Sequence, residues 1–150
     1  MAQAVKLANS AASAGEVPVG AVIVRHGVIV GTGSNNPIAT NDPSAHAEIN
    51  AIRVAAKALE NYRLTGTTLY VTLEPCCMCA GAILNARIDR VVFACRDKRA
   101  GAAGSQVNLL ETPFLNHRCR VESGVLENEC RLLLQAFFVT RRKLRGASHD

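Results

Sequence analysis

The sequence predicts an α/β fold, a three-layer α/β/α sandwich with helices on both faces of a central five-stranded sheet. Two observations predict it. Short runs rich in Val, Ile and Thr alternate with longer segments in which apolar residues recur at helical spacing. Their order is helix, strand, strand, helix, strand, helix, strand, strand, helix, which can place helices on both faces of one sheet.

The composition fits one compact domain, which we expect to span residues 1–150. Hydrophobic residues make up 49% of the chain and charged residues 19%, a balance typical of a folded globule. Tryptophan is absent and aromatic residues make up 4%, so we expect a core of Val, Leu, Ile and Ala.

The first half of the chain predicts a helix, a hairpin and a second helix. Apolar residues recur every three or four positions over 2–14. The apolar runs 19–24 and 28–32 flank a glycine that can take the positive φ of a hairpin turn. Turn-forming residues fill 34–41, which we expect to be a loop. The Asp-Pro pair at 42–43 resembles a helix N-cap followed by a first-turn proline, so a helix is predicted from there to about residue 59.

The second half predicts three more strands and two helices. Apolar and β-branched runs predict strands at 67–72, 90–95 and 120–123. Helical periodicity predicts a helix over 76–86, opened by Pro75, and a long helix over about 126–144. We expect contacts, and not regular structure, to order the polar, glycine-rich segment 96–113.

Net charge and cysteine content indicate which kind of binding partner and which cellular compartment to expect. A net charge of +5 and a pI of about 9.1 favour a polyanionic partner, although many basic enzymes bind no nucleic acid. Six cysteines could form a disulfide framework in so short a chain. Residues 1–15, however, lack the apolar core of a secretory signal peptide, and no apolar run is long enough to span a membrane. We therefore expect a reducing cytoplasm.

Two motifs, His-Ala-Glu at 46–48 and Pro-Cys-Cys-Met-Cys at 75–79, predict a zinc site. His46, Cys76 and Cys79 offer one imidazole nitrogen and two thiolates, which leaves the fourth tetrahedral position of Zn²⁺ free for water. On a helix the two cysteines share a face, and the helix N-terminus favours thiolates. The motifs therefore predict one zinc ion per subunit, in the layout of a catalytic site.

Glu48 is the candidate catalytic residue. Zinc in such a site lowers the pKa of its water towards roughly 7 and so supplies hydroxide at neutral pH. The hydroxide can attack the electron-poor carbon of a cytosine or adenine ring while Glu48 moves protons to the ring and to the departing ammonia. The pattern H-x-E followed by P-C-x-x-C resembles the signature of zinc-dependent nucleobase deaminases.

Simpler interpretations exist for each motif. A lone C-x-x-C is often structural or redox-active, and a lone H-x-E occurs by chance. A structural zinc needs a fourth protein ligand, and Cys77 points about 100° away from Cys76 on a helix, so catalytic zinc is favoured. The remaining histidines and cysteines are expected at the surface and as small apolar residues, respectively: His26, His117 and His149, and Cys95, Cys119 and Cys130.

Four stretches carry a resemblance to a known family. They are Gly-Glu-Val-Pro-Val-Gly-Ala-Val from Gly15, Asn-Asp-Pro-Ser-Ala-His-Ala-Glu-Ile from Asn41, Leu-Tyr-Val-Thr-Leu-Glu-Pro-Cys-Cys-Met-Cys-Ala-Gly-Ala from Leu69, and 96–105. Together they resemble the bacterial tRNA-specific adenosine deaminases of the cytidine and deoxycytidylate deaminase superfamily. The zinc motifs are specific to the superfamily, whereas 96–105 and Asn116-His117 point to the tRNA enzymes.

The resemblance implies hydrolytic deamination of adenosine to inosine at the wobble position of a tRNA anticodon, usually an arginine tRNA in bacteria. Its zinc ligands and proton shuttle fall on the same four residues as above. It also implies that Asn35 contacts the inserted nucleoside and that Asp97 lies near its sugar. By the same resemblance the fold is cytidine-deaminase-like, with a mixed sheet whose fifth strand runs parallel to the fourth. The protein is expected to be a homodimer with the active site near the subunit interface.

The basic run at 141–145 is a candidate for RNA contact. Arg141 and Arg142, together with Arg96, can hold phosphates of the tRNA anticodon stem-loop. The alternative is a solvated helix end whose cations complement the helix dipole. Phe138 can stack on a base, although buried packing is an equal possibility.

Two other functions stay open. The first is a deaminase of a free base or nucleoside, such as cytidine or guanine, that uses the same zinc site. The second is a nucleic-acid-binding module with a structural zinc ion and no turnover. Glu48 argues against the second, because a structural site has no use for an unliganded carboxylate beside its histidine.

Overall fold

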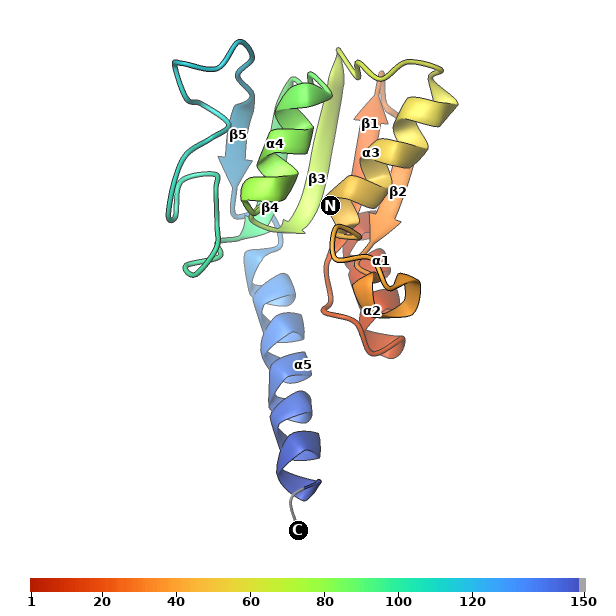
Figure 1. Ribbon diagram of the computed structural model, residues 1–150, viewed down its shortest axis with the longest axis vertical. Helices are drawn as coiled ribbons and strands as arrows, with labels where there is room; N and C mark the ends of the chain where they lie inside the picture. The colour runs from red at the N-terminus through yellow and green to blue at the C-terminus, as the bar shows by residue number, and fades with distance from the viewer. Residues whose placement is uncertain (149–150) are drawn as a thin grey trace.

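The computed structural model describes residues 1–148, which form a five-stranded sheet with helices on both faces (Figure 1). The elements are α1 (Ala2–Ser13), β1 (Gly20–Arg25), β2 (Val28–Ser34), α2 (Pro37–Thr40), α3 (Ala47–Ala58), β3 (Thr67–Leu73), α4 (Cys77–Asn85), β4 (Arg90–Cys95), β5 (Arg120–Ser123) and α5 (Glu127–Ala147). The predicted α/β class and all five predicted strands are confirmed. His149 lies outside the described residues.

The sheet is mixed, with the strand order β2-β1-β3-β4-β5. β1 pairs antiparallel with β2 and β3, whereas β3, β4 and β5 run parallel. The hairpin between β1 and β2 turns at His26 and Gly27, with φ of 50° and 74°, because a two-residue turn of matching twist needs two left-handed residues. The parallel pairing of β4 with β5 confirms the strand direction that the resemblance implied.

Close approaches of backbone to backbone hold helices on opposite faces of the sheet. A Cβ at Gly20 would lie 2.0 Å from the Ala4 carbonyl oxygen, so α1 rests directly on β1. A Cβ at Gly33 would lie 2.3 Å from the Ala47 carbonyl oxygen at the start of α3. Gly33 pairs with Ala21, the neighbour of Gly20, and side chains alternate along a strand, so the two glycines face opposite ways. Glycine at position 33 therefore lets the start of α3 lie directly on β2.

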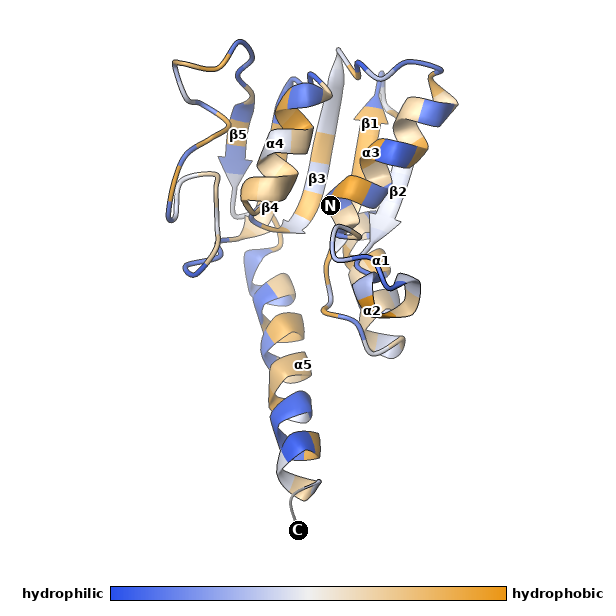
Figure 2. Ribbon diagram, viewed as in Figure 1, coloured by the Kyte–Doolittle hydropathy of each residue, from blue (hydrophilic) through white to orange (hydrophobic). Residues whose placement is uncertain are grey.

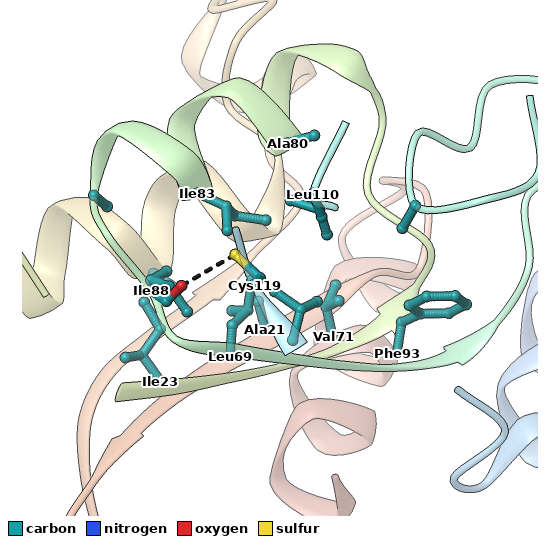
Figure 3. Packing of buried hydrophobic residues seen from close by; sticks show 14 of the residues in the cluster. Ala21, Ile23, Leu69, Val71, Ala80, Ile83, Ile88, Phe93, Leu110 and Cys119 are labelled. Carbon is teal, nitrogen blue, oxygen red and sulfur yellow. Dashed lines mark hydrogen bonds between the residues drawn. The ribbon is translucent and has the colours of Figure 1, made fainter. Parts of the chain in front are cut away.

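The main core lies between the sheet and the helices α3 and α4 (Figure 3). Its fully buried side chains include Ile23, Leu69, Val71, Ile83, Ile88, Val91, Phe93 and Leu110. A smaller cluster joins Val5 of α1, Ala94 and Cys95 of β4 and Cys130 of α5. Cys95, Cys119 and Cys130 are all buried, as expected for small apolar residues.

The segment before α3 differs from its prediction. Residues 37–40 of the expected loop form the single-turn helix α2, with Pro37 at its first position. α3 begins at Ala47 and not at the Asp-Pro pair. The reason is local, because Asp42 Oδ1 accepts hydrogen bonds from the N–H and the hydroxyl of Ser44, which closes a turn before the helix.

The start of α5 packs on α1 and the sheet, Arg141 further along the helix contacts Gly15, and the helix extends away from the sheet (Figure 1). Cys130 is its buried residue, whereas Leu132, Phe138 and Leu144 are exposed. Figure 2 shows α5 hydrophilic at its start, apolar in the middle and hydrophilic again towards its end. Within residues 1–148, no helix combines the length and hydrophobicity needed to cross a membrane.

Candidate metal centre and substrate pocket

Two helix starts bring the three predicted zinc ligands together. His46 is the N-cap of α3, and Cys76 is the N-cap of α4, with Cys79 in the first turn of α4. His46 Nδ1 lies 3.6 Å from Cys76 Sγ and 3.5 Å from Cys79 Sγ. The three possible ligand atoms all lie within 4.8 Å of one another.

These distances fit a tetrahedral zinc ion. Zn–N bonds near 2.0–2.1 Å and Zn–S bonds near 2.3 Å, set at the tetrahedral angle, put nitrogen and sulfur about 3.6 Å apart. Nitrogen and thiolate donors are also the chemistry that zinc prefers. The group offers three protein ligands, which is the number found in catalytic sites with one position open.

The electrostatics of the group favour a thiolate at Cys76. A hydrogen bond from the Cys79 thiol, helped by His46, lowers the pKa of Cys76 to about 3 even though partial burial opposes the shift. The same hydrogen bond raises the pKa of Cys79. The hydrogen bond with Cys76 raises the pKa of His46. Metal ligands must be deprotonated, so a bound cation would replace the protons that these side chains share.

Glu48 lies beside the metal group in the first turn of α3. It is 4% exposed, and its burial raises the pKa of the carboxyl to about 7. A carboxylate with this pKa accepts a proton readily near neutral pH, as a general base must. Glu48 can therefore exchange a proton next to the metal group and is not needed as a ligand.

A pocket of about 140 Å³ opens over the metal group. His46, Glu48 and Cys76 line it, and so do Asn35 and Asp97. The remaining lining residues are Val19, Leu73, Glu74 and Ala100. Residues of the metal group thus line the same pocket as the two residues that the family resemblance implies for nucleoside contact.

Asn35 and Asp97 also organise the backbone around them. Asn35 is 9% exposed, and its Oδ1 accepts a hydrogen bond from the first residue of α3. Asp97 Oδ1 accepts hydrogen bonds from the backbone N–H groups of Arg99 and Ala100, at 3.0 and 3.2 Å. That turn brings Ala100 into the pocket lining.

The other four candidate RNA-binding residues do not line the pocket. Arg96 lies against the Phe93 ring, with its guanidinium carbon 5.5 Å from the ring centre. Arg141 donates a hydrogen bond to the Gly15 carbonyl oxygen and lies over Phe137. Phe138 and Arg142 are exposed on the projecting part of α5.

Sequence reasoning missed Glu74, which is 2% exposed and lines the pocket directly before the zinc motif. Its carboxylate accepts hydrogen bonds from three backbone N–H groups and one hydroxyl of the segment 97–105. One sequence signal could have found it. A carboxylate between the apolar end of a buried strand and the helix-opening Pro75 must find donors to be buried there.

Comparisons with known proteins agree with this geometry. Residues 1–95 match the family described as the cytidine and deoxycytidylate deaminase zinc-binding region. The tRNA-specific adenosine deaminase of Haemophilus influenzae is 51% identical over 144 residues, covering 95% of this chain and 83% of that protein. That of Bacillus subtilis is 47% identical over 148 residues, covering 99% and 92%. The chain belongs to the tRNA-specific adenosine deaminase family.

A solved structure from studies of A-to-I editing by tRNA:A34 deaminases at the wobble position of transfer RNA matches with a TM-score of 0.85. It is 44% identical, and the match covers 87% of this chain and 95% of that chain. The cytidine-deaminase-like fold is thereby confirmed. The family match and the His/Cys/Cys group together confirm zinc as the cofactor of this deaminase.

Proposed function

We propose that the protein hydrolyses adenosine to inosine at the wobble position of a tRNA anticodon, with an arginine tRNA as its substrate. The observation that carries the reaction is the buried Glu48 beside the His/Cys/Cys group, in a pocket that Glu48, His46 and Cys76 line. The choice of tRNA adenosine is supported by relatives that bear this activity in their names at up to 51% identity.

His46, Cys76 and Cys79 would hold the zinc ion, as their mutual distances and donor chemistry support. When bound, zinc supplies a Lewis acid and a water of lowered pKa. The helix starts that carry these ligands keep them in place, because α3 rests on β2 and α4 follows directly from β3.

Glu48 acts as the proton shuttle. Its carboxylate takes a proton from the attacking water and delivers it to a ring nitrogen of adenine. It then moves the proton of the added hydroxyl to the amino group, which leaves as ammonia while the carbonyl of inosine forms. One carboxylate suffices, because these transfers occur in sequence. Burial keeps bulk water from competing for the proton.

The pocket residues orient the nucleoside. Because Asn35 Oδ1 is occupied by the backbone of α3, its Nδ2 is left to donate to an acceptor of the base or ribose. Asp97 lines the same pocket, and its Oδ2 would accept a hydrogen bond from a ribose hydroxyl. Wobble bases are unstacked and can be splayed into such a pocket, whereas a base inside a duplex cannot reach it.

The wider assembly is part of the proposal. The exposed Arg142 and Phe138, with Arg96 and Arg141, would contact the anticodon stem-loop outside the pocket. Residues 1–150 would act as one deaminase domain in a cytoplasmic homodimer. The buried free thiols of Cys95, Cys119 and Cys130 support a reducing compartment. Sedimentation velocity measures the subunit number.

The experiment that tests the function compares three substrates on the zinc-loaded protein. An anticodon stem-loop with adenosine at the wobble position should yield inosine. The same stem-loop with the adenosine moved to a neighbouring loop position, and free adenosine, cytidine or guanine, should yield little product. Turnover of a free base without turnover of the stem-loop would instead establish the small-molecule deaminase.

A further inference from the structure

Glu74 is a buried carboxylate with an unusual set of partners, all from one loop. Its Oε1 accepts a hydrogen bond from the Asp97 N–H at 3.2 Å and one from the Ser105 hydroxyl. Its Oε2 accepts from the N–H groups of Ala103 and Ser105, both at 3.1 Å. Arg96 Nη1 lies 3.9 Å from Oε1. The carboxylate therefore binds both ends of the segment 97–105 and holds them together.

The backbone around Glu74 ties the same loop to the zinc motif. The Glu74 N–H donates to the Cys95 carbonyl oxygen at 2.9 Å, at the point where β4 leaves the sheet. The Ala102 N–H donates to the Pro75 carbonyl oxygen at 2.8 Å, directly before Cys76. One short stretch thus carries a metal-binding cysteine and anchors the loop that bears Asp97.

The loop leaves room for the carboxylate at one position. A Cβ at Gly101 would lie 2.2 Å from Glu74 Oε2, so only glycine permits this packing. Ala102 and Ala103 are buried beside it. Small residues let the loop close around Glu74, and the four donors offset the cost of removing its charge from water.

We propose that Glu74 is a positioning residue for the deamination. It fixes the Asp97 wall of the substrate pocket relative to Cys76 and the metal group, and so holds Asp97 where it can bind the nucleoside's sugar while the base reaches the metal group. This inference rests on the proposed function for its substrate. The anchoring itself rests only on the contacts of Glu74.

The variant Glu74→Gln tests the anchor with little change in shape. Each carboxylate oxygen accepts two donors, and each pair includes at least one backbone N–H. Whichever way the glutamine amide turns, its NH₂ group faces a backbone N–H that it cannot accept from. Losing one hydrogen bond to a charged group changes the equilibrium constant that depends on it, for local opening or for binding, by about 10- to 100-fold.

Hydrogen exchange measured on the zinc-loaded protein gives the direct result. In Glu74→Gln the amides of Asp97, Ala103 and Ser105 should exchange about tenfold faster or more, while the sheet amides keep their protection. The matched control Glu60→Gln changes an exposed glutamate and should leave every amide unchanged. Unchanged exchange at 97–105, or an equal rise throughout the sheet, would overturn the proposal.

Kinetics and metal content separate positioning from chemistry. In Glu74→Gln the KM for the anticodon stem-loop should rise by about 10- to 100-fold with a much smaller change in kcat, because substrate binding is weakened and Glu48 is untouched. Zinc should stay at one ion per chain, and loss of zinc would overturn the proposal. Ser105→Ala removes only the hydroxyl donor and should shift KM in the same direction by less, which keeps the test open where Glu74→Gln does not fold.

The two proposals fail in different ways. If the wild-type protein does not deaminate the stem-loop, the proposed function is wrong. The exchange rates of the three loop amides still show whether Glu74 anchors the segment 97–105. If the wild-type protein forms inosine and Glu74→Gln matches it in KM and in loop exchange, the positioning role is wrong and the function stands.

Discussion

Asn35 Oδ1 accepts a 2.8 Å hydrogen bond from the backbone N–H of Ala47. Ala47 is the first residue of α3 and lies between His46 and Glu48, so a pocket residue caps the helix that carries the chemistry. The bond uses the oxygen of the Asn35 amide and leaves its nitrogen for the substrate. The proposed substrate contact and the geometry of the metal group are thus joined through one side chain.

Substitutions at Asn35 separate these two roles. Asn35→Asp keeps an acceptor for the Ala47 N–H and loses the Nδ2 donor, so we expect retained zinc and stability with kcat/KM lowered about tenfold. Asn35→Ala loses both, and the lost cap lowers the free energy of unfolding by about 1 kcal/mol as well. Urea denaturation measures the free energy of unfolding of both variants, and kinetics with the stem-loop measure their kcat/KM. Equal kcat/KM for Asn35→Asp and the wild type would mean that Nδ2 does not contact the substrate.

Removing the Glu48 carboxylate should abolish proton transfer and leave the metal in place. Glu48→Gln keeps the size of the side chain, so we expect one zinc ion per chain and a fall in kcat of about 10²- to 10⁴-fold. Single-turnover formation of inosine measures the fall, with Glu60→Gln as the matched control. A variant with full activity would show that another group moves the protons.

Two glycines test whether β2 sets the start of α3. A Cβ at Gly33 would lie 2.3 Å from the Ala47 carbonyl oxygen and 2.6 Å from the Ala51 nitrogen. Gly33→Ala should therefore lower the free energy of unfolding by about 1–3 kcal/mol and weaken zinc binding, because it displaces the helix turn that holds His46. Competition with a chromophoric chelator measures the zinc affinity.

The control for this substitution lies in α4. A Cβ at Gly81 meets nothing within 4 Å, and the residue is inside the helix. Gly81→Ala should thus raise the free energy of unfolding by about 0.5–1 kcal/mol. If Gly33→Ala proved as harmless as Gly81→Ala, the close contact of β2 with α3 would not govern the metal site.

Cysteine alkylation at pH 8 should report the metal site directly. Burial raises the pKa of Cys95 and Cys130 to about 11 and that of Cys119 to about 12, so these thiols stay protonated and unreactive. Cys77 is exposed and should react first. Mass spectrometry after native labelling should find Cys76 modified only after zinc is chelated, because it is half-buried and its pKa is lowered, whereas Cys79 is buried with a raised pKa and should stay unmodified. Modification of Cys76 in the zinc-loaded protein would contradict the ligand assignment.

Much of the fold was predictable because its signals are local. The strands Arg90–Cys95 and Arg120–Ser123 occupy their predicted positions, since apolar and β-branched runs between turn residues have few alternatives. The metal group was also predictable. Its histidine and cysteines lie in two short motifs, and zinc chemistry restricts how such residues can combine.

The unpredicted features depend on side-chain contacts that sequence patterns do not specify. Glu74 binds donors 23 to 31 residues later, and no local pattern reveals that a lone carboxylate has them. α3 begins later than predicted because the Asp42 side chain accepts hydrogen bonds from Ser44 and closes a turn before the helix. The projection of α5 away from the sheet depends on which of its apolar residues find a partner, which periodicity alone does not specify.

The most direct test of the central claim is inosine formation by the zinc-loaded protein in an anticodon stem-loop with a single wobble adenosine. Nuclease digestion and mass spectrometry of the product locate the modified nucleoside. We expect inosine at the wobble position, its loss on chelation and its return when zinc is restored. A stem-loop that stays unmodified while a free base or nucleoside is deaminated would contradict the account.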